Sequence, residues 1–229
     1  MPREKWVYPH AATDAHDHLY MSERDELYRS PAIRIAGGRV LELARVEPKE
    51  LAYRDLYSCF PSAVQVSARE LGLEPHPPLT VTGGLTFGGG PMNNYVMHGI
   101  ARMAEVLRED PGARGLVTGN GGYLTKHAFC VYSTAPPERP FAHENLQARI
   151  DALPKRDVAT SHEGGVTVEA YSVMYGADGS PEIGHAAVRL PDGRRAWGNV
   201  SDREAAAAMT REEFCGRAAR LARDGVLSV

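Results

Sequence analysis

The amino-acid sequence predicts a layered α/β domain followed by a small antiparallel β-barrel. Up to Ser133, short apolar runs typical of strands alternate with segments of helical periodicity, which indicates helices packed on a sheet. From Gly165 onward, short alternating runs are separated by turn signals such as Pro-Asp-Gly, which indicates antiparallel strands. We therefore expect domains at 1–135 and 161–229, joined by a proline-rich linker with one short helix at 136–160.

Local signals define the elements of the first domain. Residues 1–29 show no clear period, and Ser30 and Pro31 then fit the start of a helix. The pair Gly37-Gly38 inside that helix weakens it unless another backbone packs closely there. In chain order we expect a helix at 30–44, a strand at 54–60, a helix at 61–73, a strand at 78–84, a helix capped by Asn93 or Asn94, and strands at 115–118 and 123–133.

The second domain is predicted from its turns and from the alternation of its short runs, which fit a small barrel or sandwich. An alanine-rich stretch at 203–209 predicts a short helix there. One hairpin combines Arg194, Arg195 and Trp197, a mixture that in other contexts binds nucleic acid. Because the surrounding sequence is neutral to acidic, we favour a packing or partner-docking module instead.

Composition and charge exclude several classes of function. The chain has 26 basic and 29 acidic side chains, with a formal net charge of −3, so nothing favours nucleic acid or an anionic membrane as partner. No apolar stretch is long enough to span a bilayer, and polar residues follow Met1, unlike a signal peptide. The separate residues Cys59, Cys130 and Cys215 favour reduced thiols and hence a cytoplasmic protein.

A run of glycines between Gly83 and Gly90 directly precedes a predicted helix. Glycine costs about 0.5–1 kcal/mol relative to alanine in regular structure, so such a cluster indicates close approach to a ligand, a tight turn, or both. In one interpretation Gly88, Gly89 and Gly90 let the backbone approach a ligand, while the helix directs its N-terminal amides at negative charge. In the other, the glycines let two layers pack and Asn94 caps the helix. No Lys-Ser/Thr pair follows, which disfavours a nucleotide-phosphate loop.

Five segments occur in order over residues 1–135: DAHDH, SPAIRIAG, DLYSCFPSAV, GGLTFGGGPMNNY and GLVTGNGGYLTKHAFCVYST. Together they resemble the thiolase superfamily, and more narrowly the C-terminal half of acetyl-CoA acetyltransferase-like proteins related to sterol-carrier-protein thiolases. Each segment alone is a weak signal, whereas the ordered set is specific. From about residue 155 the tail resembles the additional β-barrel, related to oligonucleotide-binding folds, that thiolase-like proteins of this type carry.

The resemblance implies the second half of a layered α-β-α-β-α body. Thiolases carry their acyl-accepting cysteine at a helix N-terminus in the first half, and none of the three cysteines of this chain has that context. The second half of a thiolase supplies three loops around the thioester. The resemblance also implies a coenzyme A thioester as ligand or substrate, with no other cofactor and no metal.

This sequence departs from the family pattern in all three loops. In the first, where the family has Asn or His, Tyr57 stands at the polar position and Ser58 follows it. The second, Gly-His-Pro in the family, reads Gly89-Gly90-Pro91 and lacks the imidazole. The third, which in the family carries an acid/base cysteine, reads Gly119-Asn120-Gly121-Gly122. Because the loss of one oxyanion donor alone costs about 10²–10³ in rate, these departures predict the loss of conventional thiolase chemistry.

Polar side chains near the loops are candidates to replace the missing groups. Asn93, Asn94 and Tyr95 lie where they could act as donors in place of the imidazole, although we favour simple helix capping over a catalytic role for any one asparagine. Tyr57, Tyr95 and Tyr123 each fall in or beside one loop. Tyrosine acts as a proton donor in thiolase-like aldolases, which gives one interpretation. Ordinary amphipathic packing gives the other, and we favour it for each tyrosine taken singly.

Histidines and cysteines have simpler explanations. His98 sits at the border between the polar and apolar sides of its helix, and we favour packing over a role as a base. Three histidines and two aspartates occur between His10 and His18, a composition that can bind zinc, but without cysteine partners we favour hydrogen bonding within a loop. Cys59 and Cys130 lie in apolar surroundings and are predicted to be inert buried thiols.

Two functions of different classes remain. The first is a thiolase-like acyltransferase that acts on or binds acyl-CoA and is incomplete without a first half carrying the nucleophile. The second is a non-catalytic acyl-CoA-binding or assembly subunit of a thiolase or thiolase-like aldolase. Half of a two-sheet stack leaves apolar surface uncovered, so both hypotheses predict a dimer or a hetero-oligomer.

Overall fold

The computed structural model describes residues 2–76, 78–90 and 92–229, and the chain divides into two compact units. The first unit comprises residues up to Leu19 together with Tyr28–Leu153. The second comprises Tyr20–Leu27 and Pro154–Val229. Each unit is built on a five-stranded sheet, and the two are described separately below.

The first sheet is mixed and has the strand order β2-β3-β4-β1-β5. Its parallel pairs are β2 with β3 and β1 with β5, whereas β4 runs antiparallel to both of its neighbours. The strands are β1 (Tyr8–His16), β2 (Tyr53–Asp55), β3 (Arg114–Gly121), β4 (Lys126–Ser133) and β5 (Ala142–Asn145).

Three expectations for this sheet are wrong. The strand expected at 54–60 is confined to β2, and residues 56–60 form a loop. Residues 8–16, expected to be irregular, form β1 inside the sheet, with Ala11, Thr13 and Ala15 buried on alternate positions. Alanine is a weak strand former, so its alternation was not recognised as a strand. The segment 78–84, expected to be a strand, is a loop in which Gly83 and Gly84 adopt φ values of 82° and 83°. Such left-handed backbone does not continue a strand.

One face of the sheet is covered by the helix expected at 30–44 and by α2 (Pro61–Glu70). The first helix contains a π-helical turn, Ile33–Gly37, followed by α1 (Gly38–Ala44). A Cβ added at Gly37 would lie 2.3 Å from Cδ2 of Leu71, so the close approach at the glycine pair involves side chains rather than backbone. Under these helices lies the larger apolar core of the unit.

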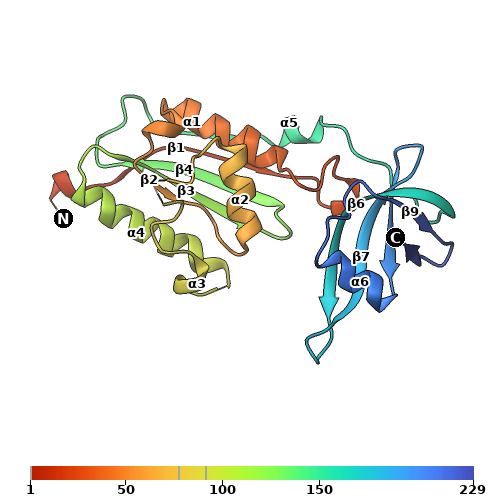
Figure 1. Cartoon of the computed structure of the whole chain (residues 1–229). Coiled ribbons are helices and arrows are strands. Elements are labelled where there is room, and N and C mark those ends of the chain that lie inside the picture. Colours follow the sequence, from red (N-terminus) through yellow and green to blue (C-terminus); the bar gives the residue numbers. More distant parts are fainter. Residues whose placement is uncertain (1, 77, 91) are drawn as a thin grey trace. The chain divides into compact units, whose positions relative to one another are not determined.

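The other face carries the predicted amphipathic helix, α4 (Tyr95–Glu109), over β2 and β3 (Figure 1). The contact is tight, because a Cβ added at Gly115 would lie 2.1 Å from Sδ of Met103. Helices on both faces make this unit an α-β-α sandwich, as expected. The remaining short helices are η1 (Arg3–Lys5), η4 (Pro48–Glu50), α3 (Leu85–Gly88), η5 (Met92–Asn94) and α5 (Gln147–Asp151).

The second unit is a curled antiparallel sheet with the order β10-β9-β6-β7-β8. A bridge between Asn199 and Val226 brings the two ends of the sheet together, so the sheet forms a half-barrel. The apolar core of this unit lies inside the curl. Its elements are η2 (Met21–Glu23), β6 (Gly164–Tyr175), β7 (Pro181–Arg189), β8 (Arg195–Val200), α6 (Arg203–Met209), β9 (Ala218–Leu221) and β10 (Leu227–Ser228).

A fully buried arginine ties the segment Tyr20–Leu27 into the second unit. Nε and Nη2 of Arg195 each donate to a carboxylate oxygen of Glu169 at 2.7 Å. Nη1 of the same guanidinium donates to the backbone oxygen of Ser22 at 2.8 Å and to that of Arg24. Because Arg195 is engaged inside the unit, it is not available to bind nucleic acid.

Candidate functional site

Three segments meet at the carboxyl ends of the parallel strands β2 and β3. The loop after β2 bonds to β3, because the backbone N–H of Tyr57 donates to Oγ1 of Thr118 at 2.9 Å. The same loop bonds to the glycine loop through Ser58, whose Oγ accepts from the N–H of Leu85 at 3.0 Å. At the end of β3, Nδ2 of Asn120 contacts Sγ of Cys59 at 3.3 Å. The two glycine segments and the loop after β2 therefore form one edge of the unit.

Tyr95 bonds to Thr82, the residue just before the glycine loop. Its hydroxyl lies 2.5 Å from Oγ1 of Thr82, and the ring packs edge-on against Tyr57 with centroids 5.3 Å apart. The Tyr95 side chain is buried, and burial raises the pKa of both tyrosines. The hydroxyl of Tyr95 is thus engaged within the protein, whereas Tyr57 remains partly exposed.

Asp55 is a fully buried carboxyl that the sequence analysis missed. Its Oδ1 accepts from the N–H of Val81 and from Oγ1 of Thr82, each at 3.1 Å. Because the Thr82 hydroxyl has one proton, donating it to Asp55 makes Tyr95 the donor to Thr82. Oδ2 of Asp55 has no hydrogen-bond partner among the described residues and faces Gly99, where an added Cβ would lie 2.4 Å away. Burial raises the pKa of this carboxyl. Its position at the end of β2, two residues before Tyr57, was the available signal.

Cys59 is partly exposed at the edge where the three segments meet. It was predicted to be an inert buried thiol, but it is only partly buried, and its sulfur lies against the amide of Asn120 in the third loop, while its inertness stays a prediction. Although the third loop itself has no thiol, a thiol from the first loop lies beside it. Oδ1 of Asn120 is buried and has no partner among the described residues. Cys130 fits the prediction better, since burial raises the pKa of its thiol to about 11.

The other predicted residues lie around this edge and are exposed or partly exposed. Asn94 occupies the cap position of α4, but its side chain makes no capping hydrogen bond, contrary to the capping expectation. The ring of His98 lies 6.3 Å from that of Tyr95. Gly88 approaches the ring of Tyr95, whereas Gly89 and Gly90 border open space. Asn93, Gly121 and Tyr123 contribute exposed or partly exposed positions, and Pro91 lies outside the described residues.

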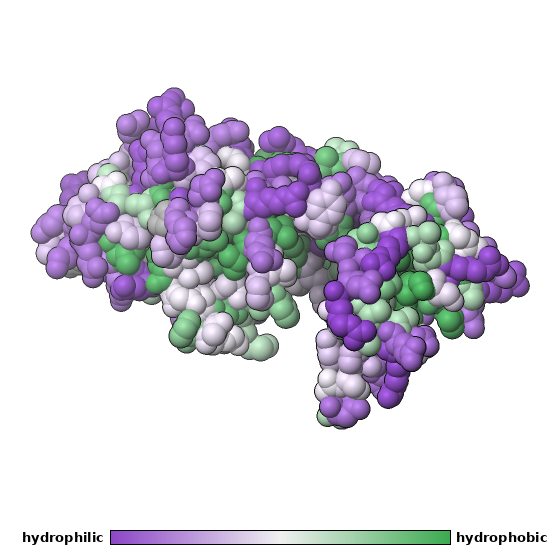
Figure 2. Space-filling model, in the orientation of Figure 1, coloured by the Kyte–Doolittle hydropathy of each residue, from purple (hydrophilic) through white to green (hydrophobic). Residues whose placement is uncertain are grey.

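Large apolar side chains on these segments point into solvent. Phe87 of the glycine loop and Met92 of η5 are 82% and 85% exposed. Phe60, Met97 and Tyr123 flank them in sequence or on the neighbouring segments and are also exposed. Figure 2 shows pale and green side chains gathered at the position of α3. A large exposed apolar surface of this kind marks a binding surface.

A groove of about 380 Å³ extends from this edge over the sheet face that α4 leaves uncovered. Val96 of α4 and Gly119 of β3 line it, and a Cβ added at Gly119 would lie 3.6 Å from Val96. Farther along the sheet, Nε2 of His143 lies 2.7 Å from Oδ1 of Asp14. The helix that follows the first glycine run and the strand that holds the second glycine segment therefore line one groove.

The histidines between His10 and His18 lie in or just after β1. Nε2 of His10 contacts the backbone oxygen of Ala135 at 2.9 Å, and the backbone of His16 bonds to the side chain of Gln147. Asp17 accepts hydrogen bonds from the hydroxyl of Ser30 and from the N–H of Ala32. In the part of the chain that the structure describes, no three His, Cys, Asp or Glu residues are arranged to hold a metal ion.

A helix-covered mixed sheet with three loops at one edge, followed by a curled antiparallel sheet, is the architecture of a thiolase-like protein. A family model described as the thiolase-like protein type 1 additional C-terminal domain matches residues 145–226. Among solved structures, a monomeric SCP2-thiolase like protein type 1 from Mycobacterium smegmatis is similar, with a TM-score of 0.88 and 35% sequence identity. The match covers 99% of this chain and 51% of that one. The chain therefore belongs to the SCP2-thiolase-like proteins, and it spans about half the length of this relative.

No match was found among curated proteins. The solved relative is described as monomeric, which does not support the expectation of an oligomer. None of the helices in the described part of the chain combines the length and the apolar character that crossing a membrane requires.

Proposed function

We propose that this chain forms the second half of a thiolase-like body and binds acyl-CoA thioesters at the edge where the three segments meet. The observation that carries the proposal is the set of direct hydrogen bonds joining the loop after β2 to the glycine loop and to β3. The exposed side chains of Phe87 and Met92 supply the apolar contact that an acyl chain or a pantetheine arm requires. This binding function is the one that the geometry supports best.

Conventional thiolase chemistry is not part of this first proposal. The glycine loop has no imidazole at the position of the family histidine, and the third loop has no cysteine of its own. Tyr95, the nearest buried tyrosine, has its hydroxyl bonded to Thr82. We therefore favour a binding or assembly subunit over an acetyl-CoA acetyltransferase that is active alone.

A second candidate function, acyl transfer, rests on the contact between Cys59 and Asn120. It places a thiol beside a side-chain amide that could donate to a developing oxyanion. For this activity we further propose that a first half carrying the acyl-accepting cysteine covers the groove. The apolar lining of the groove and the uncovered face over β4, β1 and β5 support such a covering half, whether it comes from the same protein or from a partner. The unpaired cysteines support our placement of the protein in the cytoplasm.

Calorimetric titration of the full chain with acetyl-CoA tests the binding proposal. We expect saturable binding, weakened at least about tenfold in the double variant Phe60→Ser/Phe87→Ser, because burying one such side chain contributes about 1.5–3 kcal/mol. Met174→Ser, at a similarly exposed apolar position of the second unit, is the matched control and should bind as the wild type does. The proposal is wrong if acetyl-CoA does not bind, or if the control weakens binding as much as the double variant.

The acyltransfer candidate needs a different measurement. Release of free coenzyme A from acetyl-CoA is followed for the wild type, Cys59→Ser and Asn120→Ala. Each is assayed with and without the first half of a thiolase-like protein, which carries the acyl-accepting cysteine. Activity lost in Cys59→Ser and reduced about 10²–10³-fold in Asn120→Ala would support transfer through this pair. No turnover under either condition leaves binding as the function of the chain and excludes this candidate.

A further inference from the structure

A second pocket lies at the opposite edge of the first sheet from the three-segment site. Arg114 begins β3 and Asn120 lies near its end, so the two sites lie at opposite ends of this strand. The pocket has a volume of about 190 Å³ and is lined by the end of α1, the start of β3 and the segment that follows β4. Its charged and hydrogen-bonding residues are His10, Arg45, Arg114, Glu138 and Arg139.

This pocket carries an excess of positive charge. Three arginines and one glutamate line it, which gives a formal charge of +2 with neutral histidine. Among the described residues, these groups form an ion pair between Nη1 of Arg45 and Oε2 of Glu138 at 3.6 Å, with side chains 54% and 79% exposed. Exposed pairs of this kind are weak. Nη1 of Arg114 donates to the backbone oxygen of Arg45 at 3.3 Å, and this neutral acceptor leaves its charge uncompensated.

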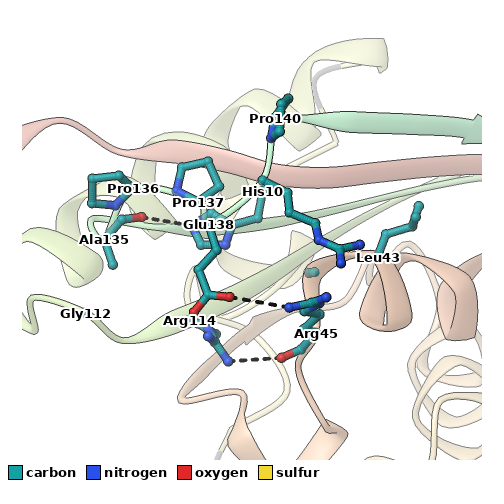
Figure 3. A pocket seen from close by; sticks show the side chains of 12 residues that line it. His10, Leu43, Arg45, Gly112, Arg114, Ala135, Pro136, Pro137, Glu138 and Pro140 are labelled. Carbon is teal, nitrogen blue, oxygen red and sulfur yellow. Dashed lines mark hydrogen bonds and ion pairs between the residues drawn. The ribbon is translucent and has the colours of Figure 1, made fainter.

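The pocket is held in place by the backbone around it. Arg45 ends α1 in the left-handed region, with φ at 51°, which fixes the direction of its carbonyl toward Arg114. The segment after β4 contains Pro136, Pro137 and Pro140, whose rings restrict the backbone. His10 holds the start of this segment through the backbone oxygen of Ala135 (Figure 3). Less ordering is therefore required when a ligand binds.

Figure 3 shows the side chains of Arg45, Arg114 and Glu138 turned toward one another. We propose that this pocket is an anion site that takes a phosphate group, with Glu138 occupying it as an internal counter-ion when no ligand is bound. Guanidinium groups match the oxygens of a phosphate with paired hydrogen bonds, and the volume suits a group of that size. Glu138 is largely exposed and bonded only weakly, so it can leave the pocket as phosphate enters. The proposal is independent of the acyl-CoA site, since it uses other residues at the other edge of the sheet.

The test is a calorimetric titration of the full chain with inorganic phosphate, AMP and acetate at low ionic strength. We expect phosphate to bind saturably, and Arg114→Gln and Arg139→Gln each to weaken binding about tenfold, equivalent to about 1.4 kcal/mol. Glu138→Gln removes the competing carboxylate and should tighten binding severalfold. Arg211→Gln, an exposed arginine of the second unit, is the control and should change nothing.

The comparison of Arg114→Gln and Arg139→Gln with the distant control Arg211→Gln separates a built site from general attraction to basic side chains. Glu138 and Arg139 are exposed, so replacing either does not disturb the core, and a thermal scan confirms that the variants fold. Tighter binding of AMP than of phosphate would assign the site to a phosphate group on a larger molecule, and equal binding to phosphate itself. The proposal is overturned if phosphate does not saturate, if acetate binds as well, or if Arg211→Gln weakens binding as Arg114→Gln does.

Discussion

The two sheets of this chain have the same number of strands but are stabilised in different ways. In the first unit, helices pack on both faces, and glycines at the contacts let Leu71 and Met103 approach the backbone. In the second, the sheet curls onto its own core, and a buried guanidinium joins it to a segment from near the start of the chain. The packing of the first unit depends on how its side chains fit together, whereas that of the second also depends on a buried ion pair. Substitutions that act on one feature at a time can separate these two modes.

The largest effect is expected at the buried ion pair of the second unit. Replacing Arg195 by Ala leaves the carboxylate of Glu169 with a reduced set of partners and removes the guanidinium donor from the backbone oxygens of Ser22 and Arg24. Breaking a buried pair in this way costs about 3–5 kcal/mol. Urea unfolding measures the loss. The control is Arg194→Ala, which breaks the exposed pair with Asp192 and should change the free energy of unfolding by less than about 1 kcal/mol. Equal effects of the two substitutions would show that the buried pair is not what stabilises this unit.

Smaller effects on stability, of opposite signs, are expected at the adjacent residues Gly37 and Gly38 of the first unit. A Cβ at Gly37 would overlap Leu71, so Gly37→Ala should destabilise the protein by about 1–3 kcal/mol. A Cβ at Gly38 meets nothing within 4 Å, and its helical φ of −60° suits alanine, so Gly38→Ala should stabilise it by about 0.4–1 kcal/mol. Thermal unfolding of both variants provides the measurement. If both substitutions destabilised to the same degree, helix packing at Gly37 would not be the limiting contact.

The smallest effects are expected in the pH dependence, and they should have opposite signs in the two units. Burial raises the pKa of Asp55 in the folded state, so the stability it contributes is complete below the unfolded pKa and is lost as the pH rises through the folded one. Burial also raises the pKa of Glu169, but hydrogen bonds from Arg195 and Arg189 outweigh this and hold it below its usual range. The stability from Glu169 is therefore present above its unfolded pKa and is lost as the pH falls through the folded one.

Urea unfolding of the wild type, Asp55→Asn and Glu169→Gln between pH 3 and pH 8 tests this contrast. Relative to the wild type, Asp55→Asn should gain stability as the pH rises, and Glu169→Gln should lose it. Each unit of difference between folded and unfolded pKa corresponds to about 1.4 kcal/mol. Parallel pH profiles for all three proteins would contradict the opposite signs.

Elements with a strong period or clear turn chemistry could be predicted from the sequence. The apolar positions of α4 recur at helical spacing, and the strands β6 to β8 are separated by clear turns. The alanine-rich β1 was missed because small side chains give little periodic signal, although its alternate residues are buried. The segment at 78–84 has strand-like composition, yet the left-handed glycines at its end and the hydrogen bonds that Asp55 accepts from Val81 and Thr82 hold it as a loop.

The candidate site could be predicted only at the level of segments. The resemblance brought the three loops together, but the contact between Cys59 and Asn120 joins residues 61 positions apart and has no signal in either segment. The buried Asp55 was overlooked because an aspartate is rarely fully buried without a charged partner. Asn94 shows the reverse error, because a residue suited to capping occupies the cap position without making the bond.

The segment Tyr20–Leu27 has a consequence for the order in which the protein acquires its structure during synthesis. This segment leaves the ribosome early, but Glu169 and Arg195, which complete its surroundings, follow well over a hundred residues later. The half-barrel cannot close until both have been translated, whereas most of the helix-covered sheet is by then available. A fragment that begins at Pro154 would hold an arginine deprived of its carbonyl acceptors, so separate expression of the tail requires the early segment to be supplied in trans.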